Sequence, residues 1–163
     1  MNVETKQKKR TMKTLFVTLA LLCASLGCSS ADGEEWVYFS SDTQDSDFFY
    51  DSESISFPST NIIGVWKKRL FSEEAKKQII IDRTEAELST VGFDELSYAL
   101  IREEINCKTR KSNILAIYYF GKTGNIISRV TVPSRIESWN TLHPGSIGDV
   151  LRKTVCKLRN IVK

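Results

Sequence analysis

The chain has 163 residues, of which 23 are Lys or Arg, 20 are Asp or Glu and one is His. Residues 1–27 contain five of the bases and one of the acids, so the remainder holds 18 bases and 19 acids. A basic partner-binding role inferred from the charge of the whole chain would therefore reflect only this N-terminal segment. Its length fits one domain with a single hydrophobic core.

The N-terminus has the pattern of an export signal. The basic segment MNVETKQKKRTMK precedes an apolar run that begins at Leu15 and extends to Leu26. This run is shorter than the roughly 20 apolar residues of a membrane-spanning helix, and small residues follow it, as in signal peptides.

Two cleavage sites fit this signal. The sequence SLGC resembles the lipobox of bacterial lipoproteins, in which the cysteine, here Cys28, receives the lipid. The alternative is cleavage after Ala31, which would leave a protein without an anchor. We expect lipid attachment at Cys28, a signal at 1–27, a short polar tether at 28–35 and a single domain at 36–163.

Cys107 and Cys156 remain once Cys23 leaves with the signal and Cys28 is lipidated or removed. In an oxidising compartment we expect the two remaining cysteines to pair, which stabilises a loop of this size by about 4 kcal/mol. Zinc binding is the alternative, but two isolated cysteines and one distant histidine do not make a tetrahedral ligand set. We therefore expect no metal and no cofactor.

The first half of the domain predicts short strands. Aromatic runs bounded by Asp and Ser begin at Trp36 and Asp47, and SISF alternates until Pro58 ends it. In NIIGVWKKRLF both faces of the strand carry bulky side chains, which predicts a central strand.

The segment 72–88 changes to a helical period. Ser72 is a suitable N-cap, and Glu73 and Glu74 complement the positive end of the helix dipole. The apolar face of this helix is thin, so we expect it to lie on the surface.

Strands are predicted again after the helix. YALIREEINC alternates, with Ile101, Ile105 and Cys107 on one face. NILAIYYF and NIISRVTV, joined by GKTG, predict a β-hairpin.

The C-terminal segment predicts an amphipathic helix with Ser146 as its N-cap and Asp149 completing a capping box. Its apolar stripe consists of Ile147, Val150, Leu151, Thr154, Leu158 and Ile161. At 100° per residue, Cys156 lies nearly opposite the centre of this stripe. Either the helix loosens before Cys156, or the strand that carries Cys107 covers the back of the helix, or the disulfide joins two molecules.

No catalytic site is predicted. His143 precedes Pro144 and Gly145, which turn the chain into the last helix, so we interpret it as a loop residue. Glu103 and Glu104 are adjacent on a strand and point to opposite faces, so they cannot act together on one bond. No nucleophile, metal or phosphate-binding motif occurs.

One compact basic cluster occurs in NCKTRKSN, where we predict Lys108, Arg110 and Lys111 to contact a partner. As a loop between two strands this segment needs no function. It lacks the interleaved aromatic residues of a nucleic-acid site, so we expect no nucleic acid as partner. An acidic protein surface or a sulfated polysaccharide is the partner that suits it.

Several stretches along the chain resemble the bacterial surface-adhesin protein E family, from about Trp36 to Lys157. In order they are Trp36, FFYDSESI, VWKKRLF, EINCKTRK, YYFGKTGNII, and SW followed by HPGSIGDVLRKTVC. The resemblance implies an α+β fold: a curved antiparallel sheet of about six strands, with a C-terminal helix packed on it and tethered by a Cys107–Cys156 disulfide. The helix at about 72–88 is additional.

The resemblance also implies an outer-membrane lipoprotein that binds host matrix and serum proteins through the stretch from Tyr98 to Asn113. We therefore expect an exported, lipid-anchored protein of the bacterial outer membrane or periplasm that binds a macromolecular partner without catalysis. The alternative is a structural or assembly lipoprotein that acts as a homodimer. Its two contact regions would be the acidic segment from Asp32 to Glu53, with eight acids and no base, and the basic region after Cys107.

Overall fold

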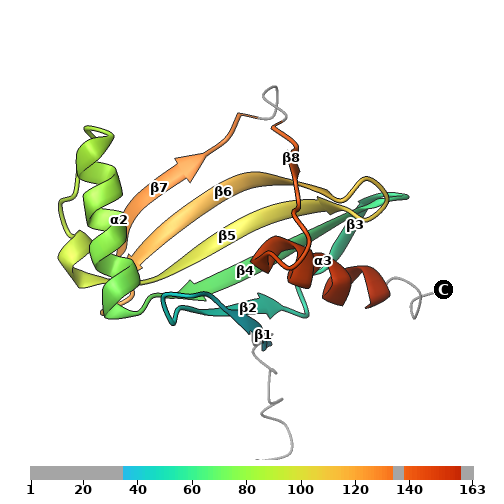
Figure 1. The fold of residues 1–163 in the computed structure, drawn as a ribbon, viewed down its shortest axis with the longest axis horizontal. Helices are drawn as coiled ribbons and strands as arrows, with labels where there is room; N and C mark the ends of the chain where they lie inside the picture. The colour runs from blue at the N-terminus through green and yellow to red at the C-terminus, as the bar shows by residue number, and fades with distance from the viewer. Residues whose placement is uncertain (1–34, 134–137, 159–163) are drawn as a thin grey trace, which may run out of the picture. The chain divides into compact units, whose positions relative to one another are not determined.

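The computed structural model describes residues 35–133 and 138–158. These residues form one antiparallel sheet, two α-helices and a short 3-10 helix (Figure 1). The predicted signal, Cys28 and most of the predicted tether lie outside the described residues. The strands are β1 (Trp36–Ser41), β2 (Asp47–Asp51), β3 (Ser56–Ser59), β4 (Ile62–Leu70), β5 (Leu96–Asn106), β6 (Lys111–Gly121), β7 (Ile126–Thr131) and β8 (Asn140–Thr141). The helices are α2 (Glu73–Glu85), η1 (Phe93–Glu95) and α3 (Ile147–Leu158).

Six strands form the continuous sheet in the order β1-β2-β4-β5-β6-β7, while β3 pairs with β4 and β8 pairs with β6. This path matches the predicted sheet of about six strands and places β4 inside it, as predicted. The strands twist and curve across the sheet (Figure 1). β3 differs from the prediction, because it continues through Pro58 to Ser59, which pairs with Ile62. Proline is tolerated there because β3 pairs on one side only, with β4.

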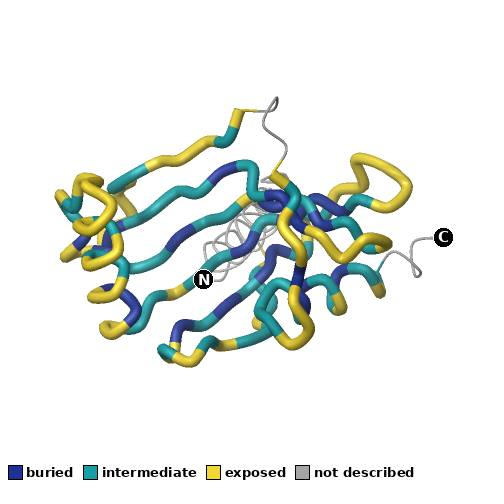
Figure 2. The backbone as a smooth tube through the Cα atoms, turned by 45° about the horizontal axis from the view of Figure 1, so that its top comes forward, coloured by how far each residue is buried: buried dark blue, intermediate teal, exposed yellow. Residues whose placement is uncertain are grey.

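Alternation along β4 separates two faces of the sheet. Ile63 and Val65 point toward α3 and are at most 2% exposed. They form one core cluster with Ile105 of β5 and with Leu151 and Val155 of α3. The buried backbone segments lie along the middle strands, whereas α2 and the turns are mostly exposed (Figure 2).

The buried face of α3 is rotated from the stripe predicted from the sequence. Leu151 and Val155 are fully buried, and Val155 was not part of that stripe. Leu142 belongs to the same core cluster and packs beside Gly148 so closely that a Cβ on Gly148 would meet the Leu142 side chain at 2.6 Å. Cys156 is partly buried against the same core cluster, on the flank of the buried face.

α2 lies at the opposite end of the sheet from α3 (Figure 1). Ser72 caps it as predicted, because its Oγ accepts a hydrogen bond from the Ala75 amide at 3.0 Å. Only Ala75 and Lys76 are buried in the helix, and Ile81 is 48% exposed. The prediction of a surface helix is therefore confirmed.

Candidate functional site

The disulfide joins the end of β5 to α3. The Sγ atoms of Cys107 and Cys156 are 2.00 Å apart, their Cα atoms are 5.9 Å apart, and 49 positions separate them in sequence. The predicted pairing is confirmed as intramolecular. The helix does not loosen before Cys156, since α3 continues to Leu158. The third explanation, a bond between two molecules, is wrong.

The turn that follows Cys107 has a defined backbone geometry. The Asn106 side-chain oxygen accepts hydrogen bonds from the amides of Lys108 and Thr109, at 3.1 and 3.0 Å. Arg110 adopts a left-handed conformation with φ 57°, and its carbonyl accepts a hydrogen bond from the Leu142 amide. These bonds hold the backbone of the turn that carries the basic side chains.

Asp149 of α3 binds three of the surrounding bases. Its Oδ1 lies 2.8 Å from Arg152 Nη2 and 3.5 Å from Arg110 Nη2, and its Oδ2 lies 2.9 Å from Lys153 Nζ. The Gly145 amide donates a further hydrogen bond to Oδ2. Asp149 is fully buried beneath these groups. The buried carboxylate thus holds the turn and α3 together.

We define the basic cluster as Lys108, Arg110, Lys111, Arg152 and Lys153. Lys108 and Lys111 are exposed, and within the described residues neither has an ion pair. The structure therefore places the predicted Lys108 and Arg110 on the β5–β6 turn and Lys111 at the start of β6. It adds two bases from α3 that the sequence prediction missed. The i, i+3 and i, i+4 spacing from Asp149 could have indicated both of them.

The electrostatics of Asp149 make the stability of this region depend on pH. Hydrogen bonds from Lys153, Arg152 and the Gly145 amide hold the pKa of Asp149 far below its ordinary value of 3.8. A lowered folded-state pKa stabilises the protein fully above the pKa of the unfolded chain. The stabilisation is lost as the pH falls from about 3.8 toward the folded-state value.

We expect Asp149→Asn to lower the thermal midpoint at pH 7 by several degrees, because the amide cannot pair with three cations. The variant should also lose less stability than the wild type between pH 4 and pH 2. Thermal unfolding followed by circular dichroism across this range measures both effects. Glu85→Gln is the matched control, since Glu85 is exposed on α2. Equal pH dependence in Asp149→Asn and the wild type would contradict the assignment.

The groups considered for catalysis do not come together. His143 is exposed, and its carbonyl accepts hydrogen bonds from the Ser146 amide and hydroxyl, as expected of a turn that leads into a helix. Glu103 is buried while Glu104 lies on the other face. The described residues contain no group of three or more potential metal ligands.

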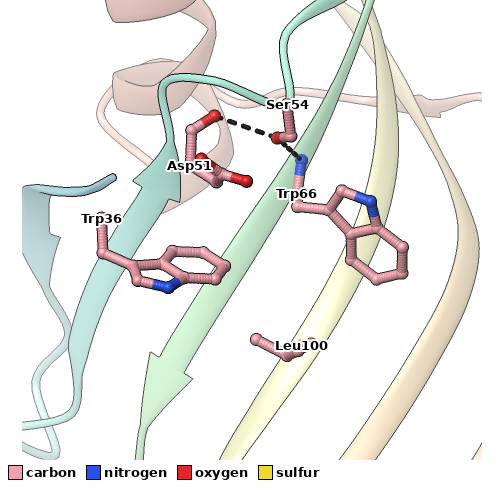
Figure 3. A pocket seen from close by; sticks show the side chains of 5 residues that line it. All are labelled: Trp36, Asp51, Ser54, Trp66 and Leu100. Atoms are coloured by element: carbon pink, nitrogen blue, oxygen red, sulfur yellow. Dashed lines mark hydrogen bonds between the residues drawn. The ribbon is translucent and has the colours of Figure 1, made fainter. Parts of the chain in front are cut away.

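A pocket of about 380 Å³ lies on the other face of the sheet from α3 (Figure 3). Its lining comes from four strands and one turn: Trp36, Asp51, Ser54, Trp66 and Leu100. The sequence prediction missed this pocket, although the first four residues lie within the stretches that carry the family resemblance.

Comparison with known proteins decides the family. The family described as surface-adhesin protein E matches residues 36–157, which is most of the chain. The chain belongs to the surface-adhesin protein E family. This family indicates a surface adhesin, and hence an exported protein with a non-enzymatic role that binds a ligand on a host surface.

No curated protein matched the chain. Within the described residues, neither helix has the length and hydrophobicity to span a bilayer.

Proposed function

We propose that this surface-adhesin protein E domain binds an anionic macromolecule, either an acidic protein surface or an acidic polysaccharide, through the basic cluster. Three of the five bases, Arg110, Arg152 and Lys153, contact the buried carboxylate of Asp149, and the other two lie beside Arg110 along the chain. This grouping supports the proposal. Asp149 neutralises a single charge, so the cluster keeps a net positive charge. Lys108 and Lys111 carry most of the expected binding, because within the described part of the chain neither has an acidic partner.

The rigid turn supports the same proposal. Arg110 is 46% exposed at its side chain and reaches Asp149, so it is both a surface group and a link to α3. A partner that meets this turn finds cations from two elements at fixed positions. Complementary charge at such a site accelerates association and makes binding depend on salt.

The test is binding of the double variant Lys108→Glu, Lys111→Glu to heparin and to an acidic extracellular-matrix protein. We expect at least a tenfold loss of affinity at low salt, because two attractions become repulsions. Surface plasmon resonance with the purified mature chain measures this loss and its salt dependence. Arg110 stays unchanged, so that its contact with Asp149 remains.

The control is the double variant Lys77→Glu, Lys122→Glu, which changes the net charge equally at exposed positions on α2 and beside Gly121. It should bind like the wild type. Equal losses in both double variants would show a response to net charge alone and would refute a role for the basic cluster. Binding that neither variant alters would also refute it.

The lipid anchor at Cys28 belongs to the same proposal. Its support is the export signal and the pairing of Cys107 with Cys156, which leaves Cys28 as the odd cysteine after cleavage before it. Mass spectrometry of the mature N-terminus should find a diacylated Cys28. An unmodified N-terminus after Ala31 would instead support a soluble periplasmic or secreted protein.

The homodimer remains the alternative function, with the acidic and basic regions in contact. Multi-angle light scattering across a salt series tests it, because charge pairing between copies weakens as salt is added. A monomer at every salt concentration would exclude it and leave the basic cluster available for another partner.

A further inference from the structure

The pocket on the sheet face opposite α3 is built around a buried carboxylate. Asp51 ends β2 and is 7% exposed. Its Oδ1 accepts a hydrogen bond from the Glu53 amide at 3.1 Å. Its other oxygen, Oδ2, takes no part in this bond. Figure 3 shows the carboxylate between the indoles of Trp36 and Trp66, with Leu100 opposite.

Hydrogen bonds between the Ser54 side chain and the backbone hold this arrangement in place. The Ser54 hydroxyl donates to the Asp51 carbonyl at 2.9 Å and accepts from the Trp66 amide at 3.2 Å. The turn after β2 is thereby fixed to β4. The Trp66 ring also lies 5.9 Å from the ring of Tyr118, which supports its orientation. The acceptor and the aromatic walls are therefore preorganised for a ligand.

The charges around the pocket select against an ionic ligand. The Lys68 Nζ lies 3.9 Å from the centroid of the Trp36 ring, so a second cation would meet an ammonium group already beside the pocket. An anion would meet the carboxylate of Asp51 between the two indoles. On the other indole, Arg102 Cζ lies 5.9 Å from the centroid of the Trp66 ring. Charges of both signs therefore border the pocket, which favours an uncharged ligand.

We propose that this pocket binds a neutral pyranose ring of a glycan. A pyranose has C–H groups on its faces and hydroxyl groups around its rim. The C–H face packs on an indole, whose ring face is negatively polarised. A rim hydroxyl donates to Asp51 Oδ2, a charge-assisted hydrogen bond in a partly desolvated site. Few well-placed polar groups among aromatic walls are typical of small-ligand pockets.

This site is distinct from the basic cluster, because Trp66 and the core residues Ile63 and Val65 point to opposite faces of β4. The two proposals therefore fail separately. A failure to bind polyanions would not argue against the pocket. A failure to bind pyranoses would not argue against the basic cluster.

Saturation-transfer difference NMR of the purified mature chain tests the proposal. The probes are the methyl pyranosides of glucose, galactose, mannose and N-acetylglucosamine at millimolar concentration. We expect at least one to bind, with the strongest transfer to the protons of one ring face and with a change in tryptophan fluorescence. Tetramethylammonium chloride and sodium methanesulfonate are the cationic and anionic probes, both with methyl protons, and should not bind.

Two variants locate the site. Asp51→Asn keeps the Oδ1 acceptor of the Glu53 amide but removes the charge, and Trp66→Leu keeps apolar bulk but removes the indole. Each should weaken binding by about tenfold or more. The controls are Asp94→Asn, at an exposed acid, and Tyr119→Leu, at an aromatic residue on the other face. Both controls should bind like the wild type.

Three results would overturn the proposal. The first is the absence of binding by all four pyranosides to the wild type. The second is binding of tetramethylammonium or methanesulfonate in their place. The third is pyranose binding that Asp51→Asn and Trp66→Leu leave unchanged. If Trp66→Leu does not fold, Asp51→Asn and the wild-type measurements decide the question.

Discussion

The double variant Cys107→Ala, Cys156→Ala is expected to be destabilised by about 4 kcal/mol, because the unfolded chain regains the entropy of an open loop. The bond closes a loop whose ends are 49 positions apart in sequence. For a domain of this size the thermal midpoint should fall on the order of 15 °C. Thermal unfolding of the mature chain by circular dichroism measures the shift.

The reductant tris(2-carboxyethyl)phosphine provides the control. It should lower the midpoint of the wild type to that of the double variant and leave the double variant unchanged. Intact mass should rise by two hydrogens when the wild type is reduced. A wild-type midpoint that does not respond to complete reduction would show that the bond adds little to stability.

The second large effect concerns a buried ion pair between β4 and β5. Lys67 Nζ lies 2.7 Å from Glu103 Oε2, and the side chains are only 10% and 3% exposed. Removing one partner leaves the other charge buried without compensation. We expect Lys67→Met to destabilise the protein by about 3 kcal/mol or more. Urea unfolding followed by tryptophan fluorescence gives the free energy of unfolding.

The matched variant is Lys67→Met combined with Glu103→Leu, which removes both charges. It should recover most of the lost stability, because an apolar pair of similar volume replaces a desolvated ion pair. A double-mutant cycle then gives the coupling free energy of the pair. Additive losses from the two single variants would show that the charges do not interact strongly.

The strands and helices were predictable where short sequence signals determine their bounds. β1 and β2 begin at Trp36 and Asp47, as the aromatic runs indicated, and Ser72 caps α2. The hairpin of β6 and β7 follows from its glycine-containing turn. Such signals act over a few residues, so a single sequence contains them. The disulfide needed a further argument, from compartment and family, and the structure confirms it.

The sites were less predictable because they join distant segments. Arg110 meets Asp149 only because the disulfide and Leu142 bring the β5–β6 turn against α3. The rotated face of α3 depends on the contact between Leu142 and Gly148, which helical periodicity does not contain. The pocket assembles Trp36, Asp51 and Trp66 from three neighbouring strands, and sequence spacing does not determine which of their faces becomes hollow.

The disulfide between the β5–β6 turn and α3 also determines when the basic cluster is assembled. Lys108 and Arg152 belong to segments separated by most of the second half of the chain, and the link between Cys107 and Cys156 holds those segments together. Cytosolic thiols are kept reduced, whereas the exported compartment is oxidising. A newly synthesised chain therefore lacks this link before export. The binding surface that we propose would therefore be completed only after export.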